Sequence, residues 1–132
     1  MADLFKLHII TPERKFYGGE ASMVELTTTE GEIGVYRNHI PMTAIVAPGV
    51  LKIHEAGGVK EAALMSGFIE ILPEKIVIMA EVVEWPEEID INRAEEARVR
   101  AERRLKEQSG EIDLIRAETA LRRALIRLSL TK

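Results

Sequence analysis

Five arginines and one aspartate near the C-terminus have the spacing needed to hold a polyanion. They are Asp90, Arg93 and Arg100 in one segment and Arg116, Arg123 and Arg127 in the next. Residues three, four or seven positions apart share one face of a helix, and guanidinium groups match phosphate oxygens in shape and charge. Folding the two segments together would collect four arginines that repel one another unless an anion lies between them. The alternative is an ordinary solvated face on which Asp90 is only a helix N-cap.

Other catalytic and metal-binding patterns are missing from the sequence. The chain has no Gly-x-x-x-x-Gly-Lys-[Ser/Thr] loop and no Gly-x-Ser-x-Gly elbow. His8, His39 and His54 do not have metal-ligand spacing, and there is no cysteine. We therefore expect a protein that is not an enzyme and has no catalytic residues and no metal site.

Residues 86–132 are predicted to form an antiparallel two-helix hairpin. Asp90 suits an N-cap position, Glu95 and Glu96 suit the first turns, and Gly110 marks the break between the helices. The apolar stripes are Ala94, Ala97, Ala101 and Leu105 on the first helix, and Ala117, Ala120 and Ala124, flanked by Leu121, Leu125 and Leu128, on the second. Six alanine methyls contribute at most ~5 kcal/mol, so a hairpin that opens and closes is physically reasonable.

Residues 1–85 are predicted to form a β-sandwich of two packed antiparallel sheets. The candidate strands are Leu4–Ile10, Arg14–Tyr17, Ser22–Thr29, Gly31–Val35, Met42–Val46, Gly49–Glu55, Lys60–Ser66, Phe68–Leu72 and Lys75–Val82. Turn residues separate them, including Gly18-Gly19 and Pro48-Gly49. No helical period interrupts the series, so the fold class is α+β, with the sandwich first and the hairpin second.

The segment from Gly31 to Met42 is a candidate contact loop. Its two glycines allow bends or close approach, and Asn38 tolerates a left-handed backbone. One interpretation is a structural hairpin with a solvated His39. The other is a loop that presents Glu32 and His39 to a partner.

Composition limits the class of protein. The 132 residues are 46% hydrophobic, enough for a core, and no apolar run is long enough to cross a bilayer. Residues 1–88 have 7 basic and 14 acidic side chains, whereas residues 89–132 have 11 basic and 8 acidic ones. The overall acidity argues against nucleic acid as a partner of the whole chain, while the basic tail suits an acidic one.

The run GEIGV at residues 31–35, followed by Asn38, His39 and Pro41 and later by the helical tail, resembles the epsilon subunits of bacterial F-type ATP synthases. This resemblance implies a sandwich of about ten strands on the rotor, with Glu32 and His39 contacting the gamma subunit and the ring of c subunits. It also implies a tail that restrains ATP hydrolysis. In its extended form, Arg116, Arg122 and Arg123 would meet an acidic loop of the beta subunits, close to the alpha subunits.

The run IDINRA at residues 89–94 resembles the motif of epsilon subunits that bind ATP on the folded hairpin. The resemblance implies an ATP site made of Glu84, Ile89, Asp90, Arg93, Ala94, Arg100, Arg123 and Arg127. ATP would be a regulatory ligand, and its dependence on magnesium is left open.

Together these features predict a non-catalytic central-stalk subunit with an ATP-sensing tail, peripheral to the membrane on the cytoplasmic face of a bacterial cell. The alternative from another class is a stand-alone β-sandwich adaptor that binds a partner helix.

Overall fold

The computed structural model describes residues 4–107 and 110–131 in two compact units, Met1–Glu84 and Trp85–Lys132. The expected boundary lay after residue 85, one position further on. Each unit is described by itself.

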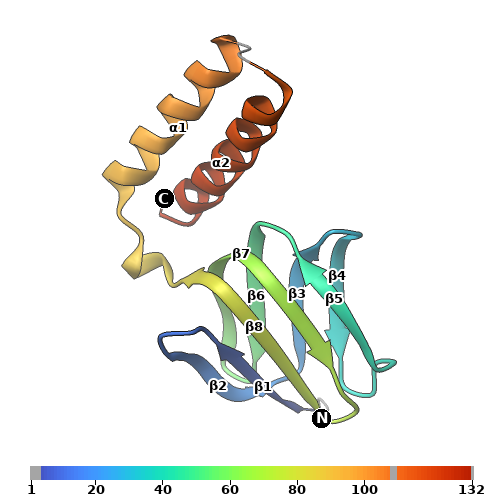
Figure 1. Cartoon of the computed structure of the whole chain (residues 1–132). Coiled ribbons are helices and arrows are strands. Elements are labelled where there is room, and N and C mark those ends of the chain that lie inside the picture. The colour runs from blue at the N-terminus through green and yellow to red at the C-terminus, as the bar shows by residue number, and fades with distance from the viewer. Residues whose placement is uncertain (1–3, 108–109, 132) are drawn as a thin grey trace. The chain divides into compact units, whose positions relative to one another are not determined.

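The first unit is a β-sandwich (Figure 1). Its strands are β1 (Phe5–Ile10), β2 (Lys15–Ala21), β3 (Met23–Thr28), β4 (Gly31–Tyr36), β5 (Met42–Val46), β6 (Gly49–Glu55), β7 (Gly58–Ile71) and β8 (Lys75–Glu84). They are hydrogen-bonded in the order β2-β1-β8-β7-β5-β3-β4, and β6 pairs with both β3 and β7. The predicted sandwich is confirmed, with one addition. β1 and β8 pair in parallel, whereas the other pairs are antiparallel.

Two predicted strands are in fact one, because β7 continues through Ser66 and Gly67. The register with β8 shifts at these residues, which marks a β-bulge. Gly67 has φ +140°, and a Cβ there would lie 2.1 Å from the main-chain oxygen of Met79. The bulge lets the first half of β7 pair with β6 and the second half with β5. One long strand therefore serves both parts of the sandwich.

The predicted turn at Gly18-Gly19 is wrong, because both glycines lie inside β2. A Cβ on Gly19 would lie 2.8 Å from the hydroxyl of Tyr17, and a Cβ on Gly18 would lie 2.6 Å from Lys15 Cε. The glycines therefore make room for neighbouring side chains that fold over the strand, and the chain does not reverse there.

The core of the sandwich consists of branched apolar side chains from strands far apart in the sequence. Leu7, Ile9, Val24, Val35, Leu51, Ile53, Leu64, Ile69, Ile71, Ile76 and Ile78 are all almost fully buried. They alternate with exposed residues along most strands, as expected when one face of a sheet is covered.

The second unit begins with a short 3-10 turn, Pro86–Glu88, followed by α1 (Ile91–Glu107) and α2 (Glu111–Leu130), which pack against each other (Figure 1). The main-chain N–H of Trp85 donates to Glu88 Oε1 at 2.9 Å. Asp90 caps α1, because its Oδ1 accepts from the N–H of Arg93 at 3.1 Å. Neither described helix is long and apolar enough to cross a lipid bilayer.

Four alanines form the seam between the helices. Ala94 and Ala101 of α1 and Ala117 and Ala124 of α2 are each less than 5% exposed. The prediction that Ala97 and Ala120 complete the stripes is only partly correct, since Ala97 is half-buried and Ala120 is exposed. Both lie about 60° around their helix from the seam, on the side that holds the arginines.

Candidate functional site

The arginines expected to bind ATP lie on one side of the alanine seam. Arg93 and Arg100 directly precede the seam alanines of α1, as Arg123 directly precedes one of α2. Arg127 follows Ala124 by three residues and lies on the same side of α2. Two antiparallel helices are related by an approximate two-fold axis, which keeps equivalent sides on one face of the pair. The hairpin therefore has an arginine face, which we define as the surface that contains these four residues.

The arginine face extends beyond the four expected residues. Arg104 follows Ala101 by three residues, and Arg116 directly precedes Ala117, so both belong to the same side. All these guanidinium groups are exposed except that of Arg127, which is half-buried. Ala97 and Ala120 lie between the arginines and leave the middle of the face without bulky side chains. An extended anion could therefore lie along it.

Five arginines on this side of the hairpin carry charge that no described residue neutralises. Among the residues that the structure describes, Arg93, Arg100, Arg104, Arg116 and Arg123 form no ion pair. Arg98, by contrast, lies on the other side of α1 and pairs with both Glu95 and Glu102. A hydrogen bond from Arg98, together with its charge, holds the pKa of the Glu95 carboxyl below its usual range. An anion near these five arginines would relieve repulsion among them that no described carboxylate relieves.

Three residues of the ATP motif have structural roles. The carboxylate of Asp90 caps α1, which leaves its second oxygen outside that hydrogen bond. Ile89 and Ala94 are buried, so they hold the start of the helix in place. Glu84 ends β8 in the other unit and is half-buried.

The donor set of the arginine face suits a phosphate chain. Guanidinium groups donate pairs of parallel hydrogen bonds to phosphate oxygens. The described residues contain no cluster of three or more histidines, aspartates or glutamates that could hold a metal ion.

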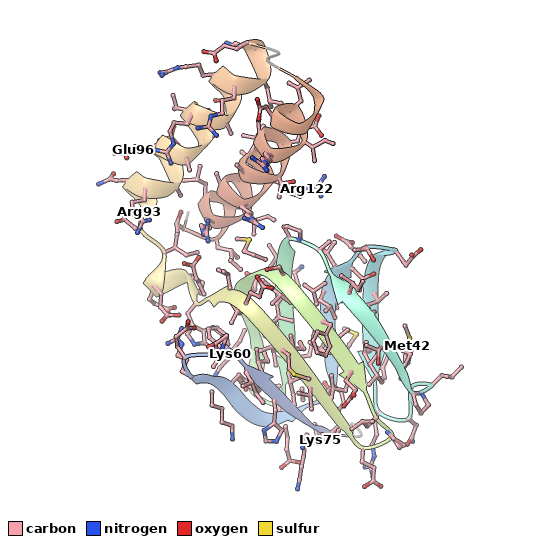
Figure 2. The ribbon with its side chains drawn as sticks, viewed as in Figure 1. Met42, Lys60, Lys75, Arg93, Glu96 and Arg122 are labelled. Carbon is pink, nitrogen blue, oxygen red and sulfur yellow. The ribbon has the colours of Figure 1, made fainter. Side chains whose placement is uncertain are left out.

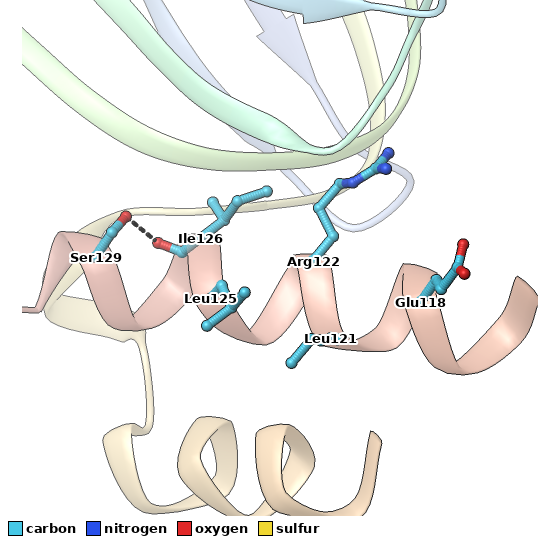
Figure 3. A pocket seen from close by; sticks show the side chains of 6 residues that line it. All are labelled: Glu118, Leu121, Arg122, Leu125, Ile126 and Ser129. Atoms are coloured by element: carbon cyan, nitrogen blue, oxygen red, sulfur yellow. Dashed lines mark hydrogen bonds between the residues drawn. The ribbon is translucent and has the colours of Figure 1, made fainter. Parts of the chain in front are cut away.

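The three arginines expected to contact the beta subunit do not share one face. Arg116 and Arg123 are seven residues apart on the arginine face, whereas Arg122 is rotated from Arg123 by about 100°. Arg122 lines a shallow pocket along α2 with Glu118, Leu121, Leu125, Ile126 and Ser129. In Figure 3, Arg122 and Ile126 point to the opposite side of α2 from Leu121 and Leu125. Figure 2 labels Arg93 on α1 and Arg122 on α2.

Glu32 lies at the start of β4 and His39 lies beyond its end, so they form no cluster. Glu32 is exposed on β4, opposite Thr27 and next to the β3–β4 turn. His39 follows the other end of β4, where its N–H donates to the oxygen of Tyr36 at 3.2 Å. Asn38 has φ +66°, as its residue type predicts. The structure thus provides two separate candidate contact points.

Sequence patterns missed an apolar row across the outer face of the sandwich. Ile45, Phe68, Met79 and Ile10 are 63%, 40%, 38% and 42% exposed. They occupy register partners on β5, β7, β8 and β1. Side chains at such positions lie about 5 Å apart on one face of a sheet. Only the register could reveal this row, because its members are distant in the sequence.

A basic corner borders the apolar row. Lys6 and Lys75 are register partners on β1 and β8, on the same sides of their strands as Ile10 and Met79. Burial lowers the pKa of His8, and the charges of Lys15, Lys75 and Lys6 lower it further. The outer face therefore combines apolar and basic groups, which suits a partner with an apolar surface and nearby carboxylates.

Both units match domains of one protein family. Residues 4–86 match the β-sandwich domain of the ATP synthase delta/epsilon chain, and residues 87–132 match its long α-helix domain. The class is therefore a subunit of an ATP synthase, and the chain belongs to the ATP synthase delta/epsilon chain family.

Within this family the chain is similar to bacterial epsilon chains. It is 45% identical over 127 residues to the ATP synthase epsilon chain of Ruminiclostridium cellulolyticum, covering 96% of this chain and 95% of the relative. It is 44% identical over 131 residues to that of Caldanaerobacter subterraneus, covering 98% and 95%. Because both segments match one family, the stand-alone adaptor is not supported.

Solved structures share the fold. A chain of the Euglena gracilis mitochondrial ATP synthase has a TM-score of 0.79 at 23% identity and covers 90% of this chain and 76% of its own length. A chain from the Tetrahymena thermophila central stalk and c-ring has a TM-score of 0.66 at 15% identity, covering 99% and 98%.

Proposed function

We propose that this epsilon chain is a non-catalytic rotor subunit whose hairpin senses ATP. ATP lies on the arginine face of the folded hairpin and favours the closed form, which permits hydrolysis. The observation that supports this proposal is the set of exposed arginines that no described carboxylate neutralises, on one side of a weak seam. The ring system would lie toward Asp90 and the phosphates along the arginines.

The seam is weak enough for a ligand to control it. The four buried alanine methyls contribute roughly 3 kcal/mol, and the half-buried leucines beside them add to this. A ligand at a hundred times its dissociation constant contributes about 2.7 kcal/mol. Because the two quantities are similar, ATP could shift the equilibrium, provided that it binds the closed form better than the open form.

Opening the hairpin would move α2 over a large distance. A helix of 17 residues such as α1 is roughly 25 Å long. In the open form, Arg116, Arg122 and Arg123 would reach an acidic loop of a beta subunit, close to the alpha subunits. This contact would block hydrolysis. Arg116 and Arg123 belong to the arginine face, so ATP on that face would compete with this docking.

A titration of the whole purified chain tests the ATP site. Millimolar ATP should raise its melting temperature. R93Q and R123Q should each raise the dissociation constant for ATP by about tenfold or more, since each removes charge-assisted hydrogen bonds. K106Q is the matched control, because Lys106 lies five residues after Ala101, on the far side of α1 from the arginine face. Titrations with and without magnesium would settle the ion's contribution. Equal melting with and without ATP would refute the proposal.

We also propose that the outer face of the sandwich binds the gamma subunit through the apolar row. The row supports this because protein interfaces place apolar side chains at their centre and charged ones at the rim. Glu32 and His39, at separate points, are proposed to contact the c-ring and the gamma subunit. Both matched mitochondrial structures include the c-ring of their own complexes, and that of Tetrahymena thermophila also includes the central stalk.

Co-elution with gamma tests the apolar row. F68D should weaken gamma binding by about a hundredfold or more, as expected when a central apolar contact is lost. V59D is the control, because Val59 is 52% exposed at the start of β7 and lies outside the row. Equal loss in both variants, or none in F68D, would contradict the assignment. Through these partners the chain would be held peripherally, on the cytoplasmic face of the cell membrane.

A further inference from the structure

The hairpin contains an internal repeat. Residues 88–105 and 111–128 align without gaps, and more than half of the aligned positions are identical. The identical pairs are Glu88/Glu111, Ile89/Ile112, Asp90/Asp113, Arg93/Arg116, Ala94/Ala117, Glu95/Glu118, Ala97/Ala120, Arg100/Arg123, Ala101/Ala124, Arg104/Arg127 and Leu105/Leu128. The motif proposed to bind ATP, Ile-Asp-x-x-Arg-Ala, thus occurs twice, once for each helix.

Several repeated residues have matching burial, whereas Arg104 is exposed and its counterpart Arg127 is half-buried. The seam alanines of α1 are buried, and so are their counterparts in α2, Ala117 and Ala124. Arg93 and Arg116 are both exposed, as are Arg100 and Arg123. Since the helices are antiparallel, the repeat gives the hairpin an approximate two-fold axis. Under such an axis each residue of one helix has an equivalent in the other.

The two-fold axis converts the expected ATP site into a second set of residues with the same side chains. Asp90 becomes Asp113, Arg93 becomes Arg116, and Arg127 becomes Arg104. Arg100 and Arg123 exchange places. The equivalents of Ile89 and Ala94 are Ile112 and Ala117. When the alignment is extended upstream, Glu84 is paired with Glu107, which ends α1.

We propose that Arg100, Arg104, Arg116 and Arg123, with Asp113, form a second triphosphate-binding position toward the tip of the hairpin. We call it the tip position and the expected one the base position. The inference rests on the proposed nucleotide-sensing function and extends it. The central arginines, Arg100 and Arg123, belong to both positions. Only one triphosphate therefore binds at a time, in either the base position or the tip position.

The outer arginines distinguish the positions. Arg93 and Arg127 belong only to the base position, whereas Arg104 and Arg116 belong only to the tip position. Along α1, Arg104 lies about 6 Å beyond Arg100. The tip position also includes Arg116 and Arg123, two of the arginines proposed to dock on a beta subunit. An anion in the tip position would cover these two arginines, and it would therefore oppose the inhibition of hydrolysis directly.

Four forms of the full chain test the tip position. They are the wild type, R93Q/R127Q, R104Q/R116Q and the combined quadruple variant, each titrated by calorimetry with ATP and with inorganic tripolyphosphate. Glutamine keeps the aliphatic stem and a good helix propensity, and helix content by circular dichroism checks that the hairpin remains folded. K106Q, added to R93Q/R127Q, is the control for loss of charge outside the arginine face.

We expect one equivalent of anion to bind the wild type and each double variant. R93Q/R127Q should retain binding through the tip position, weakened by no more than about tenfold, and adding R104Q/R116Q should weaken it by about tenfold or more again. Adding K106Q should leave it unchanged. Loss of all binding in R93Q/R127Q with helix content intact would overturn the tip position, as would residual binding insensitive to R104Q/R116Q.

The two probes separate this inference from the proposed function. Binding of tripolyphosphate with the expected variant pattern, but no binding of ATP, would support the two positions and refute nucleotide sensing. Binding of ATP through Arg93 and Arg127 alone would support nucleotide sensing and refute the tip position. Binding of neither probe to the wild type would refute both.

Discussion

The sandwich and the hairpin are stabilised in different ways. The sandwich joins strands from distant parts of the chain around large branched side chains that are almost fully buried. The hairpin joins two sequential helices through alanine methyls and keeps its arginines exposed. Large buried side chains contribute more free energy than methyl groups. The comparison indicates that the sandwich is the more stable unit, whereas the hairpin is held together by a weaker interface.

The largest expected effect is on the stability of the sandwich. I53A removes an almost fully buried side chain from β6 and should lower the free energy of unfolding of the sandwich by about 2–5 kcal/mol. K52A, next to it on the exposed side of the same strand, should change it little. Chemical denaturation followed by a probe of β-structure measures both. Equal effects would contradict the placement of the core.

A smaller effect is expected in the seam. A101L adds volume to a close helix contact and should destabilise the closed hairpin by about 1–3 kcal/mol while leaving the sandwich unchanged. A120L makes the same change at an exposed position and should have almost no effect. Hydrogen exchange of the seam amides separates the two variants. Similar protection in both would show that the seam is assigned wrongly.

The smallest effect concerns His8 of the basic corner. Burial and three lysines lower its pKa from the ordinary 6.5, so as the pH falls the unfolded chain takes up the proton first. The stability due to neutral His8 is therefore present above pH 6.5 and is lost as the pH falls toward the lowered value. H8Q should reduce the difference between melting temperatures at pH 7.5 and pH 5.5. An unchanged difference would contradict this contribution.

Local patterns predicted most of the elements but misplaced some connections. Alternation and turn residues located the strands, and small-residue spacing located both helices. The glycines at 18 and 19 and the bulge at Gly67 were misinterpreted, because glycine permits a turn, a bulge or a neighbouring side chain equally well. Which of these occurs depends on what packs against it.

The candidate sites differ in how far the sequence reveals them. Spacing was enough to place Arg93 and Arg100 on one face of a helix, since helical periodicity is local. The apolar row could not be found in this way, because Phe68 and Met79 become neighbours only through strand register. The exposure of Ala120 likewise depends on how α2 is rotated against α1.

By itself, the sequence determined the two units, the charge contrast between them and the family, because these follow from local period, composition and motif. Only the tertiary structure decided that one long strand serves both parts of the sandwich and that four alanines, not six, form the seam. It also decided that equivalent sides of the two helices make one arginine face. Such features depend on long-range packing, which places residues side by side regardless of their separation along the chain.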